Sequence, residues 1–496
     1  MSTPDEARAR GRLSFGGALA DRARRTPDAA ALVWVPAGGA HEHRTLTWAE
    51  LDRRATQVAR LLQGRGTGRE TVVAIALGNT PEHVVTAFAV WRLGGTVLPL
   101  SPTARPAERD AILEAGAARL VVADWDGGHE AVTAADVAGS RGLPADPLPD
   151  VISPRGWAIA TGGSTGRPRV VTSAEPHEHT LFDTAALRLL GRRGGMRQLT
   201  AGPIHHSGHF GSTYRGLLMA RLLVLLEAFD AATAARAIER YRIETATLTP
   251  TMMRWIAALP GIDGVDLSSL TSLVHTGGPC APDVKRWWID RVGPRHVYEY
   301  YGSTEEIGAA AIDGEEWLAH PGSVGRPLDC EMRILGPKGE ELPAREIGEI
   351  YARGSLHATR PSRAGVRRTP EGFASVGDLG WMDEDGYLYI ADRRTDLILT
   401  GGANVYPAEV EAVLCRHPAV RDAAVIGIDD KTLGKRVHAV LQLDPAAAVP
   451  SDRELYQFCG QHLSTYKVPV TYEFVERLPR DEAGKLRRSA LSPVGA

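Results

Sequence analysis

The chain has 496 residues, more than one hydrophobic core usually organises, so we expect two or more domains that share a large cleft. Its 57 basic and 60 acidic side chains leave a net charge of -3, which favours a small-molecule partner over nucleic acid. The chain shows no apolar leader and no apolar run near the roughly 20 residues of a membrane span, and its four scattered cysteines suit reduced thiols, so we expect a cytoplasmic protein without a membrane span.

The first half of the chain alternates helical patterns with short apolar runs. A helix is expected after Thr47, because Thr47 and Glu50 form a capping-box pattern ahead of an amphipathic stripe. Strands are expected in the apolar runs TVVAIAL (71–77), GGTVLPL (94–100), LVVAD (120–124), WAIA (157–160), LLVLLE (222–227), TATLTP (245–250) and LVHTGG (273–278). The alternation predicts an α/β fold with parallel-type sheets flanked by helices.

The pattern changes near Cys330, where short β-type runs separated by glycines indicate antiparallel hairpins and a small β-barrel-like part. After Asp396, strand-like runs combine with a helix that Pro407 opens, which indicates a small α+β domain. We therefore predict a large domain of residues 1–394 and a small C-terminal domain of residues 395–496.

The segment TGGSTGRPR (161–169) has the composition of a phosphate-binding loop. Its three glycines permit a close approach of the backbone, and hydroxyl groups and positive charge are present to contact phosphate oxygens. The residues concerned are Thr161, Gly162, Gly163, Ser164, Thr165, Gly166 and Arg169. A flexible polar turn is the alternative for such a loop taken alone, and the spacing is not that of a Walker A loop.

The segment YEYYGSTEE (298–306) places aromatic rings before a glycine, two hydroxyls and a carboxylate. Tyr301 suits stacking on a base, Thr304 suits donation to a phosphate, and Glu305 suits oxygen ligation of a magnesium ion. Taken alone, the segment also fits an aromatic strand that ends in a turn.

Two further segments carry charges suited to nucleotide chemistry. Asp378 and Arg393 bracket a predicted hairpin, so the carboxylate of Asp378 can accept from ribose hydroxyls with Arg393 alongside it. Lys485, in RLPRDEAGKLRR (477–488), suits neutralisation of charge that develops on a phosphate. The alternatives are ordinary turn charges for the first two residues and a solvated terminal lysine for the third.

Taken together and in this order, these segments resemble the adenylate-forming superfamily of acyl- and aryl-CoA synthetases, luciferases and nonribosomal peptide synthetase adenylation domains. The resemblance spans nearly the whole chain, through LTWAELDRRA, LGGTVLPLSP, TGGSTGRPR, the Y-G-S-T-E block, GDLGWMDEDGYLYIADR, GGANVYPAEVE and the closing D-E-A-G-K. Because so many separate motifs match jointly, the resemblance is highly specific.

The resemblance implies roles for individual residues of this sequence. The 161–169 loop would wrap the triphosphate of ATP, Tyr301 would stack on adenine beside Gly278 and Pro279, and Lys485 would be the adenylation lysine. Asp378 and Arg393 would hold the ribose, and Glu305 would hold Mg²⁺. The small domain would rotate about a hinge at Thr395 between two half-reactions. Arg169 departs from the lysine that is common at its position, which keeps the charge but alters its geometry.

The resemblance also implies where the carboxylic acid binds. His206, in GPIHHSGHF (202–210), matches a residue of the pocket wall, and the expected wall is completed by His209, Phe210, Tyr214, Thr276 and Gly277. These residues favour an aromatic or polycyclic acid over a long fatty chain. His209 is also a candidate base toward the acceptor. A zinc site at His205, His206 and His209 is the weaker alternative, since no carboxylate or cysteine accompanies them in the sequence.

The expected activity is formation of an acyl-adenylate with release of pyrophosphate, followed by transfer of the acyl group to coenzyme A. Transfer to an amine, as in an amide bond synthetase, stays open, and Val470 favours it slightly because many CoA ligases carry a basic residue there. A catalytically dead scaffold is a third reading, although Thr161, Glu305 and Lys485 are all present. Oligomeric state and the identity of the acid are left open.

Overall fold

The computed structural model describes residues 12–39, 42–125, 131–161, 168–173, 176–180, 188–354 and 366–491. The chain divides into two compact units, Met1–Thr276 with Arg286–Glu299 and Gly277–Lys285 with Tyr300–Ala496. These two units differ from the two domains predicted from the sequence, residues 1–394 and 395–496, and the boundary between residues 394 and 395 stays a prediction.

The first unit contains a mostly parallel sheet, in which the strand order is β15-β14-β13-β11-β12-β2-β3. Only the β2–β3 pair is antiparallel within this series. The strands are β2 (Ala30–Val35), β3 (Arg44–Thr47), β11 (Arg197–Thr200), β12 (Leu222–Leu226), β13 (Thr245–Leu248), β14 (Ser272–His275) and β15 (Val297–Gly302, with Val297–Glu299 in this unit). Helices connect strands that follow one another in the chain: α8 (Ser207–Met219) follows β11, α9 (Ala231–Tyr241) follows β12, α10 (Pro250–Ala257) follows β13 and α11 (Pro282–Val292) follows β14.

A second parallel sheet in the same unit has the order β5-β4-β6-β7. Its strands are β4 (Val72–Ala76), β5 (Thr96–Pro99), β6 (Leu120–Ala123) and β7 (Ala131–Val132). The accompanying helices are α2 (Phe15–Arg25), α3 (Trp48–Gly64), α4 (Pro81–Arg92), α5 (Pro106–Ala115) and α6 (Ala134–Gly139). Two antiparallel pairs complete the unit, β1 (Arg12–Ser14) with β10 (Glu178–Thr180) and β8 (Ala158–Thr161) with β9 (Arg169–Thr172). Both parallel sheets confirm the predicted alternation of strands and helices.

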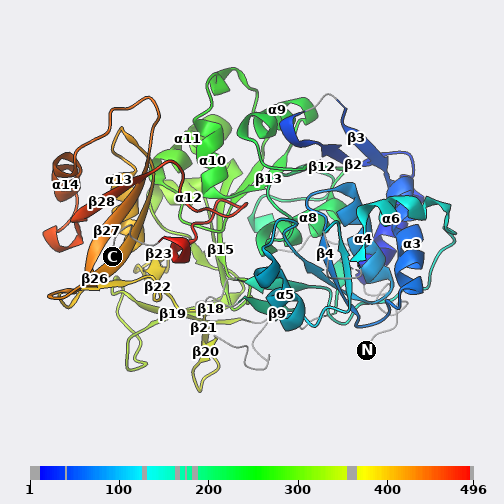
Figure 1. Cartoon of the computed structure of the whole chain (residues 1–496), viewed down its shortest axis with the longest axis horizontal. Helices are drawn as coiled ribbons and strands as arrows, with labels where there is room; N and C mark the ends of the chain where they lie inside the picture. The colour runs from blue at the N-terminus through cyan, green and yellow to red at the C-terminus, as the bar shows by residue number, and fades with distance from the viewer. Residues whose placement is uncertain are drawn as a thin grey trace. The chain divides into compact units, whose positions relative to one another are not determined.

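Local sequence explains why α3 begins where it does. The Thr47 hydroxyl accepts from the Glu50 backbone N–H at 3.2 Å, and the Glu50 carboxylate accepts from the Thr47 N–H at 2.9 Å, so the predicted capping box is confirmed. Beyond the cap, the apolar stripe of α3 packs beside α4 (Figure 1). This contact contributes Leu51, Val58 and Phe88 to the main hydrophobic core of the unit.

The second unit is mainly antiparallel, as predicted from Cys330 onward. Its sheet has the order β20-β21-β19-β22-β23, with β18 also paired to β19. The strands of this sheet are β18 (Cys330–Leu335), β19 (Gly348–Gly354), β20 (Arg367–Arg368), β21 (Ala374–Ser375), β22 (Asp378–Met382) and β23 (Leu388–Arg393). The unit also contains the antiparallel pair of β16 (Ala309–Asp313) and β17 (Arg326–Pro327), with helix α12 (Gly314–Ala319) between them in the chain.

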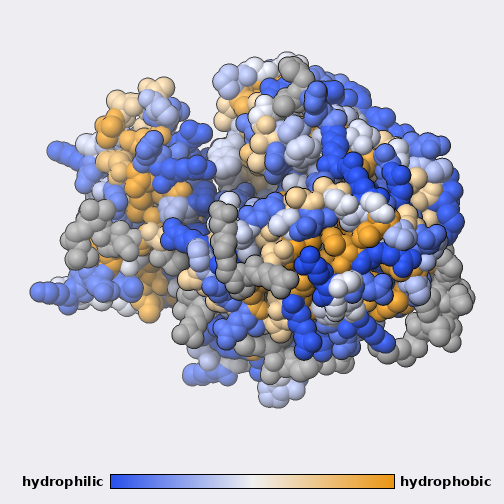
Figure 2. Space-filling view, turned by 45° about the vertical axis from the view of Figure 1, so that its right-hand side comes forward, coloured by the Kyte–Doolittle hydropathy of each residue, from blue (hydrophilic) through white to orange (hydrophobic). Residues whose placement is uncertain are grey.

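The C-terminal part of this unit, coloured from orange to red in Figure 1, has a further sheet of order β25-β24-β27-β26, with β28 paired to β27. Its elements are β24 (Ile398–Thr400), β25 (Ala403–Val405), α13 (Pro407–Leu414), β26 (Val420–Asp430), β27 (Gly434–Leu443), α14 (Asp452–Gly460) and β28 (Thr471–Val475). Pro407 begins α13, as predicted. A separate hydrophobic cluster between Ile398 and Val468 packs these elements together, and Val449 and Val470 are exposed. On the face drawn in Figure 2, hydrophobic residues are interspersed among hydrophilic ones.

Candidate functional site

The second unit brings together the predicted ribose pair and the predicted stacking tyrosine. Asp378 and Arg393 are opposite each other in the β22–β23 register, and Arg393 Nε lies 3.3 Å from Asp378 Oδ1. The Tyr301 hydroxyl donates to Asp378 Oδ2 at 2.8 Å. Burial, followed by the charge of Asp378, raises the pKa of Tyr301, so this hydroxyl keeps its proton and its role as a donor. Because Asp378 is buried, its carboxylate is a fixed acceptor.

A short hydrogen-bonded loop presents Lys485. The Asp481 carboxylate accepts from the backbone N–H groups of Ala483 at 3.0 Å and Lys485 at 2.8 Å. The backbone N–H of Asp481 donates to the Lys485 carbonyl at 2.9 Å, and Gly484 takes φ of +82°, a conformation that favours glycine. The D-E-A-G-K sequence therefore folds into a closed turn that fixes the backbone from which the lysine side chain extends.

The charge environment of Lys485 connects it with the ribose pair. Desolvation lowers the pKa of Lys485, and repulsion from the Arg393 guanidinium adds to this, while Asp481, Asp378 and Asp396 act in the opposite direction. The residue retains solvent exposure, but enough protein surrounds its ammonium group to weaken its hydration. The structure thus brings Lys485 within electrostatic reach of Asp378 and Arg393.

Ion pairs that the sequence analysis did not single out anchor the Lys485 loop. Arg488 donates to both oxygens of Glu411 at 2.7 and 2.8 Å and to Asp396 at 3.1 Å. Arg480 donates to both oxygens of Asp422 at 2.6 and 2.7 Å. These pairs tie the two ends of the loop to α13, to β26 and to the segment after β23. The sequence does show a basic residue on each side of D-E-A-G-K, which could have suggested that these arginines form ion pairs. No local sequence pattern, however, predicts which carboxylates they pair with.

The other second-unit residues lie in turns. Gly277 has φ of +89°, and a side chain at Gly278 would meet no atom within 4 Å, so the backbone before Pro279 borders open space. Thr304 and Glu305 follow β15 in a turn and are partly buried. Thr395 lies between β23 and β24, where its hydroxyl donates to Asp396 Oδ1 at 3.1 Å.

The predicted phosphate loop is flanked by two paired strands. Thr161 ends β8, Arg169 begins β9, and the two are opposite each other in the antiparallel register. The structure therefore places both ends of the loop side by side. The remaining predicted contacts lie outside the described residues, namely Gly162, Gly163, Ser164, Thr165 and Gly166.

Helix α8 carries the predicted wall of the acid pocket. His206 is the N-cap residue of this helix, and the methyl group of Thr276 lies 3.6 Å from the Cβ position of Gly208 in its first turn. The structure thus brings His206 and Thr276 into one neighbourhood. His209 is buried with its ring against Gly202, and desolvation lowers its pKa to about 3. A group with this pKa is a weak base at neutral pH, and the base role of His209 stays a prediction.

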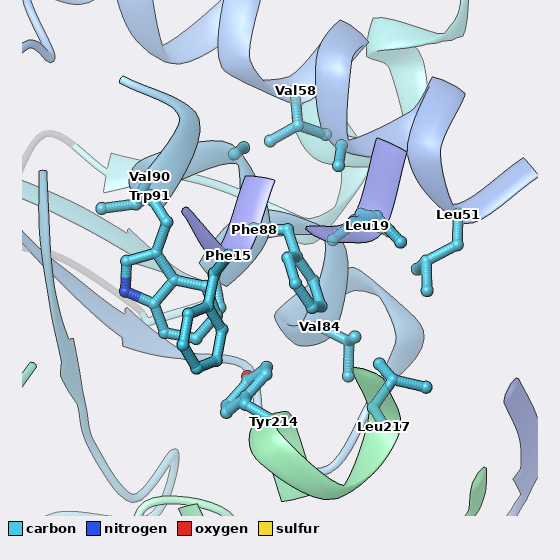
Figure 3. Close-up of a cluster of buried hydrophobic side chains, with 14 of the residues drawn as sticks. Phe15, Leu19, Leu51, Val58, Val84, Phe88, Val90, Trp91, Tyr214 and Leu217 are labelled. Atoms are coloured by element: carbon cyan, nitrogen blue, oxygen red, sulfur yellow. The ribbon is translucent and has the colours of Figure 1, made fainter. Parts of the chain in front are cut away.

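Tyr214 and Phe210 belong to the main hydrophobic core. Figure 3 shows Tyr214 directed into a cluster with Phe15, Phe88 and Trp91, and its ring is edge-on to Trp91 with centroids 4.8 Å apart. The Tyr214 hydroxyl is buried and has no hydrogen-bond partner among the described residues. These contacts are those of core packing, and the pocket role of Tyr214 stays a prediction.

The alternative zinc site has limited geometric support. The rings of His205 and His206 lie 4.6 Å apart, yet no group of three or more potential metal-ligating side chains is found in the part of the chain that the structure describes.

Comparisons with known proteins match nearly the whole chain. The model of the AMP-binding enzyme family matches residues 19–360, and the model of the AMP-binding enzyme C-terminal domain matches residues 409–485. The 2-succinylbenzoate–CoA ligase of Bacillus licheniformis is 32% identical over 491 residues, which cover 95% of this chain and 98% of that protein.

Two solved structures share the fold. The O-succinylbenzoate coenzyme A synthetase of Bacillus subtilis, in complex with ATP and a magnesium ion, matches with a TM-score of 0.78 and 27% identity over 96% of this chain and 98% of that one. The amide bond synthetase McbA of Marinactinospora thermotolerans matches with a TM-score of 0.74 and 26% identity over 96% and 98%. Among the described residues, no helix is both long enough and apolar enough to span a membrane.

Proposed function

We propose a reaction for this chain on the premise that it belongs to the AMP-binding enzyme family and is an ATP-dependent, AMP-forming ligase. It activates a carboxylic acid as an acyl-adenylate, releases pyrophosphate and transfers the acyl group to coenzyme A. The observation that carries this proposal is the placement of Lys485 within electrostatic reach of the Tyr301, Asp378 and Arg393 group.

In the first half-reaction, a carboxylate oxygen of the acid attacks the α-phosphorus of ATP. The bond from this phosphorus to the oxygen that bridges to the β-phosphorus breaks, and pyrophosphate leaves with the bonding electrons. Asp378 accepts from the ribose hydroxyls, and Lys485 donates to the oxygens on which negative charge grows. Because the ammonium of Lys485 is partly desolvated, it interacts more strongly with those oxygens than a fully hydrated lysine would.

Glu305 and Thr304 are the residues that we assign to the phosphates and their magnesium ion. A partly buried carboxylate in a turn, next to a hydroxyl, fits the oxygen ligands that Mg²⁺ prefers. When bound there, Mg²⁺ neutralises phosphate charge. Thr161 and Arg169, which flank residues 162–167 in the chain, are assigned to the triphosphate.

We also propose that the segment from Thr395 onward moves as a small domain between the two half-reactions. The support is that β24 to β28 and α13 to α14 pack around their own hydrophobic cluster. A segment with its own core can change its position without losing its fold. Such a movement would remove Lys485 after adenylation and admit the acceptor.

Coenzyme A is the favoured acceptor because the relative from Bacillus licheniformis is a CoA ligase that aligns with 95% of this chain. An amine is the second candidate, and the likeness to the amide bond synthetase McbA favours it. Val470, which is exposed and apolar, adds slight support for the amine. The acid is proposed to be aromatic, in keeping with the name of the 2-succinylbenzoate–CoA ligase of Bacillus licheniformis. The use of ATP and coenzyme A supports a cytoplasmic reaction.

A product-resolved assay tests this function. The full-length protein is incubated with ATP, Mg²⁺ and a panel of aromatic acids, with coenzyme A in one arm and simple amines in the other. We expect acid-dependent pyrophosphate release and a thioester identified by mass. Formation of an amide without any thioester would show that the acceptor is an amine and not coenzyme A. Pyrophosphate release that does not depend on any of the acids would contradict the proposal.

A further inference from the structure

Part of one face of the first-unit sheet, on β11, β13 and the start of β14, is polar although it is buried. In the parallel register, Gln198 pairs with Thr245 and Thr200 pairs with Thr247, while the next strand places Ser272 beside Thr245. Residues paired in this way point to the same face, because side chains alternate along each strand. All five side chains are buried. The opposite face of the same strands carries the apolar side chains Leu199, Ala246, Leu248 and Leu273, and the buried His275 follows them at the end of β14.

Helix α8 covers this polar face. The Gln198 amide donates to the Ser212 carbonyl of α8 at 2.8 Å, and the Thr200 and Thr213 hydroxyls lie 3.0 Å apart. The Ser272 hydroxyl donates to the carbonyl of Leu190 at 2.7 Å. The segment that contains Leu190 therefore approaches the same face, beside the helix that begins with the predicted wall of the acid pocket.

Arg192 extends from this segment onto the polar face. Its Nη2 group donates to the Thr247 hydroxyl, and its Nε is shielded from solvent with no acceptor among the described residues. No carboxylate pairs with Arg192 in the described part of the chain, and desolvation alone lowers its pKa to about 10. The side chain is thus a cation at neutral pH, and a cation shielded in this way costs several kcal/mol unless an anion joins it.

Arg192 lies near the predicted wall of the acid pocket, as the register of β13 and β14 indicates. Ser272 begins β14 and contacts the arginine segment, whereas Thr276, near His206, follows the other end of that strand. Thr247 pairs with Val274, two residues before Thr276. At a rise of about 3.3 Å per residue, the Arg192 contact lies roughly 7 Å along the strand from Thr276.

We propose that Arg192, together with the Thr247 hydroxyl, binds a second anionic group of the substrate, so that the preferred acids carry a further carboxylate besides the one that is activated. The Nε and Nη2 donors of a guanidinium match the two oxygens of a carboxylate. This inference rests on the proposed function, because it concerns the acid of the same reaction. It makes Arg192 a specificity-determining residue that takes no part in the chemical step.

The test compares acids that differ only in the second charge. Suitable probes are 4-carboxycinnamate and 2-succinylbenzoate, each beside the half-ester in which the carboxyl group that is not activated is methylated. We expect the wild-type protein to prefer each dianion by about 10- to 100-fold in kcat/KM for pyrophosphate release, the range of a charge-assisted hydrogen bond. The Arg192→Met variant should lose this preference while turnover of the half-esters stays within a few-fold of wild type.

Two further variants keep the test decisive if Arg192→Met folds poorly. Arg192→Lys keeps the charge and should retain part of the preference, and Thr247→Val should reduce it while leaving the arginine in place. Equal use of dianion and half-ester by the wild type, or an unchanged preference in Arg192→Met, would overturn the inference. Pyrophosphate release with half-esters but no preference refutes only the role of Arg192, whereas release with no acid of either kind refutes the proposed function itself.

Discussion

The ion pair between Arg488 and Glu411 allows a quantitative test of what holds Lys485 in place. Arg488 donates to both Glu411 oxygens, at 2.7 and 2.8 Å, and the two side chains keep 24% and 16% of their exposure. Removal of one partner from a buried pair costs about 3–5 kcal/mol. Because both side chains keep some exposure, we expect Arg488→Met to lower the local stability of the C-terminal segment by about 3 kcal/mol.

The cost should depend on pH, because the variant leaves Glu411 buried without its cation. Burial already raises the pKa of Glu411 above its ordinary value, so the folded chain holds this proton at a higher pH than the unfolded chain does. The stabilisation from the proton is complete below the ordinary pKa of Glu and is lost as the pH rises through the folded pKa. Removal of Arg488 raises the folded pKa further, so the deficit should be small near pH 5 and largest near pH 8.

Hydrogen exchange of the backbone amides in β26 and β27, followed by mass spectrometry, measures this local stability. Arg487→Met, which changes the exposed neighbour, is the matched control and should leave exchange unchanged. The double variant Arg488→Met with Glu411→Leu removes both charges and should recover most of the loss. Equal exchange in Arg488→Met and Arg487→Met, or a deficit that shrinks from pH 5 to pH 8, would refute the reasoning.

Three further substitutions probe the site. Lys485→Ala should slow acid-dependent pyrophosphate release by about 10²–10³-fold, the effect of losing one preorganised donor, and an unchanged rate would remove Lys485 from the mechanism. Asp378→Asn should raise the KM for ATP by about tenfold or more with a smaller change in kcat, since it removes a charged acceptor, and steady-state kinetics that show an unchanged KM would argue against ribose binding there. Tyr214→Phe removes a buried hydroxyl that has no described partner, so thermal unfolding should show equal or slightly higher stability, by up to about 1 kcal/mol, with an unchanged KM for the acid. A clear loss of stability would reveal a hydrogen bond at that hydroxyl.

Local patterns predicted what local physics determines. The capping box at Thr47 and the helix start at Pro407 depend on neighbouring residues only, and both are present. The closeness of Asp378 and Arg393 was predictable because the DEDG turn between them sets the register of one hairpin. The alternation of apolar runs and helical patterns likewise predicted the parallel sheets of the first unit.

Other contacts join residues that are remote in the sequence. Glu411 and Arg488 meet only because α13 and the end of the chain pack together, and no spacing rule links them. Arg192 is in a polar stretch of the sequence, and its hydrogen bond joins it to Thr247 of β13, a residue remote in the sequence. Tyr214 is a different case, because it was predicted to line the acid pocket, although its helical spacing from Phe210 and Leu217 is also typical of a stripe that faces the core.

The pairing of Thr161 with Arg169 has a practical consequence for engineering. Both ends of the intervening segment are held by one strand ladder, so a transplant of residues 162–167 from another family member begins and ends on fixed backbone positions. Exchange of this segment, which we propose to bind the triphosphate, is therefore a way to test its effect on nucleotide affinity while the flanking strands are unchanged.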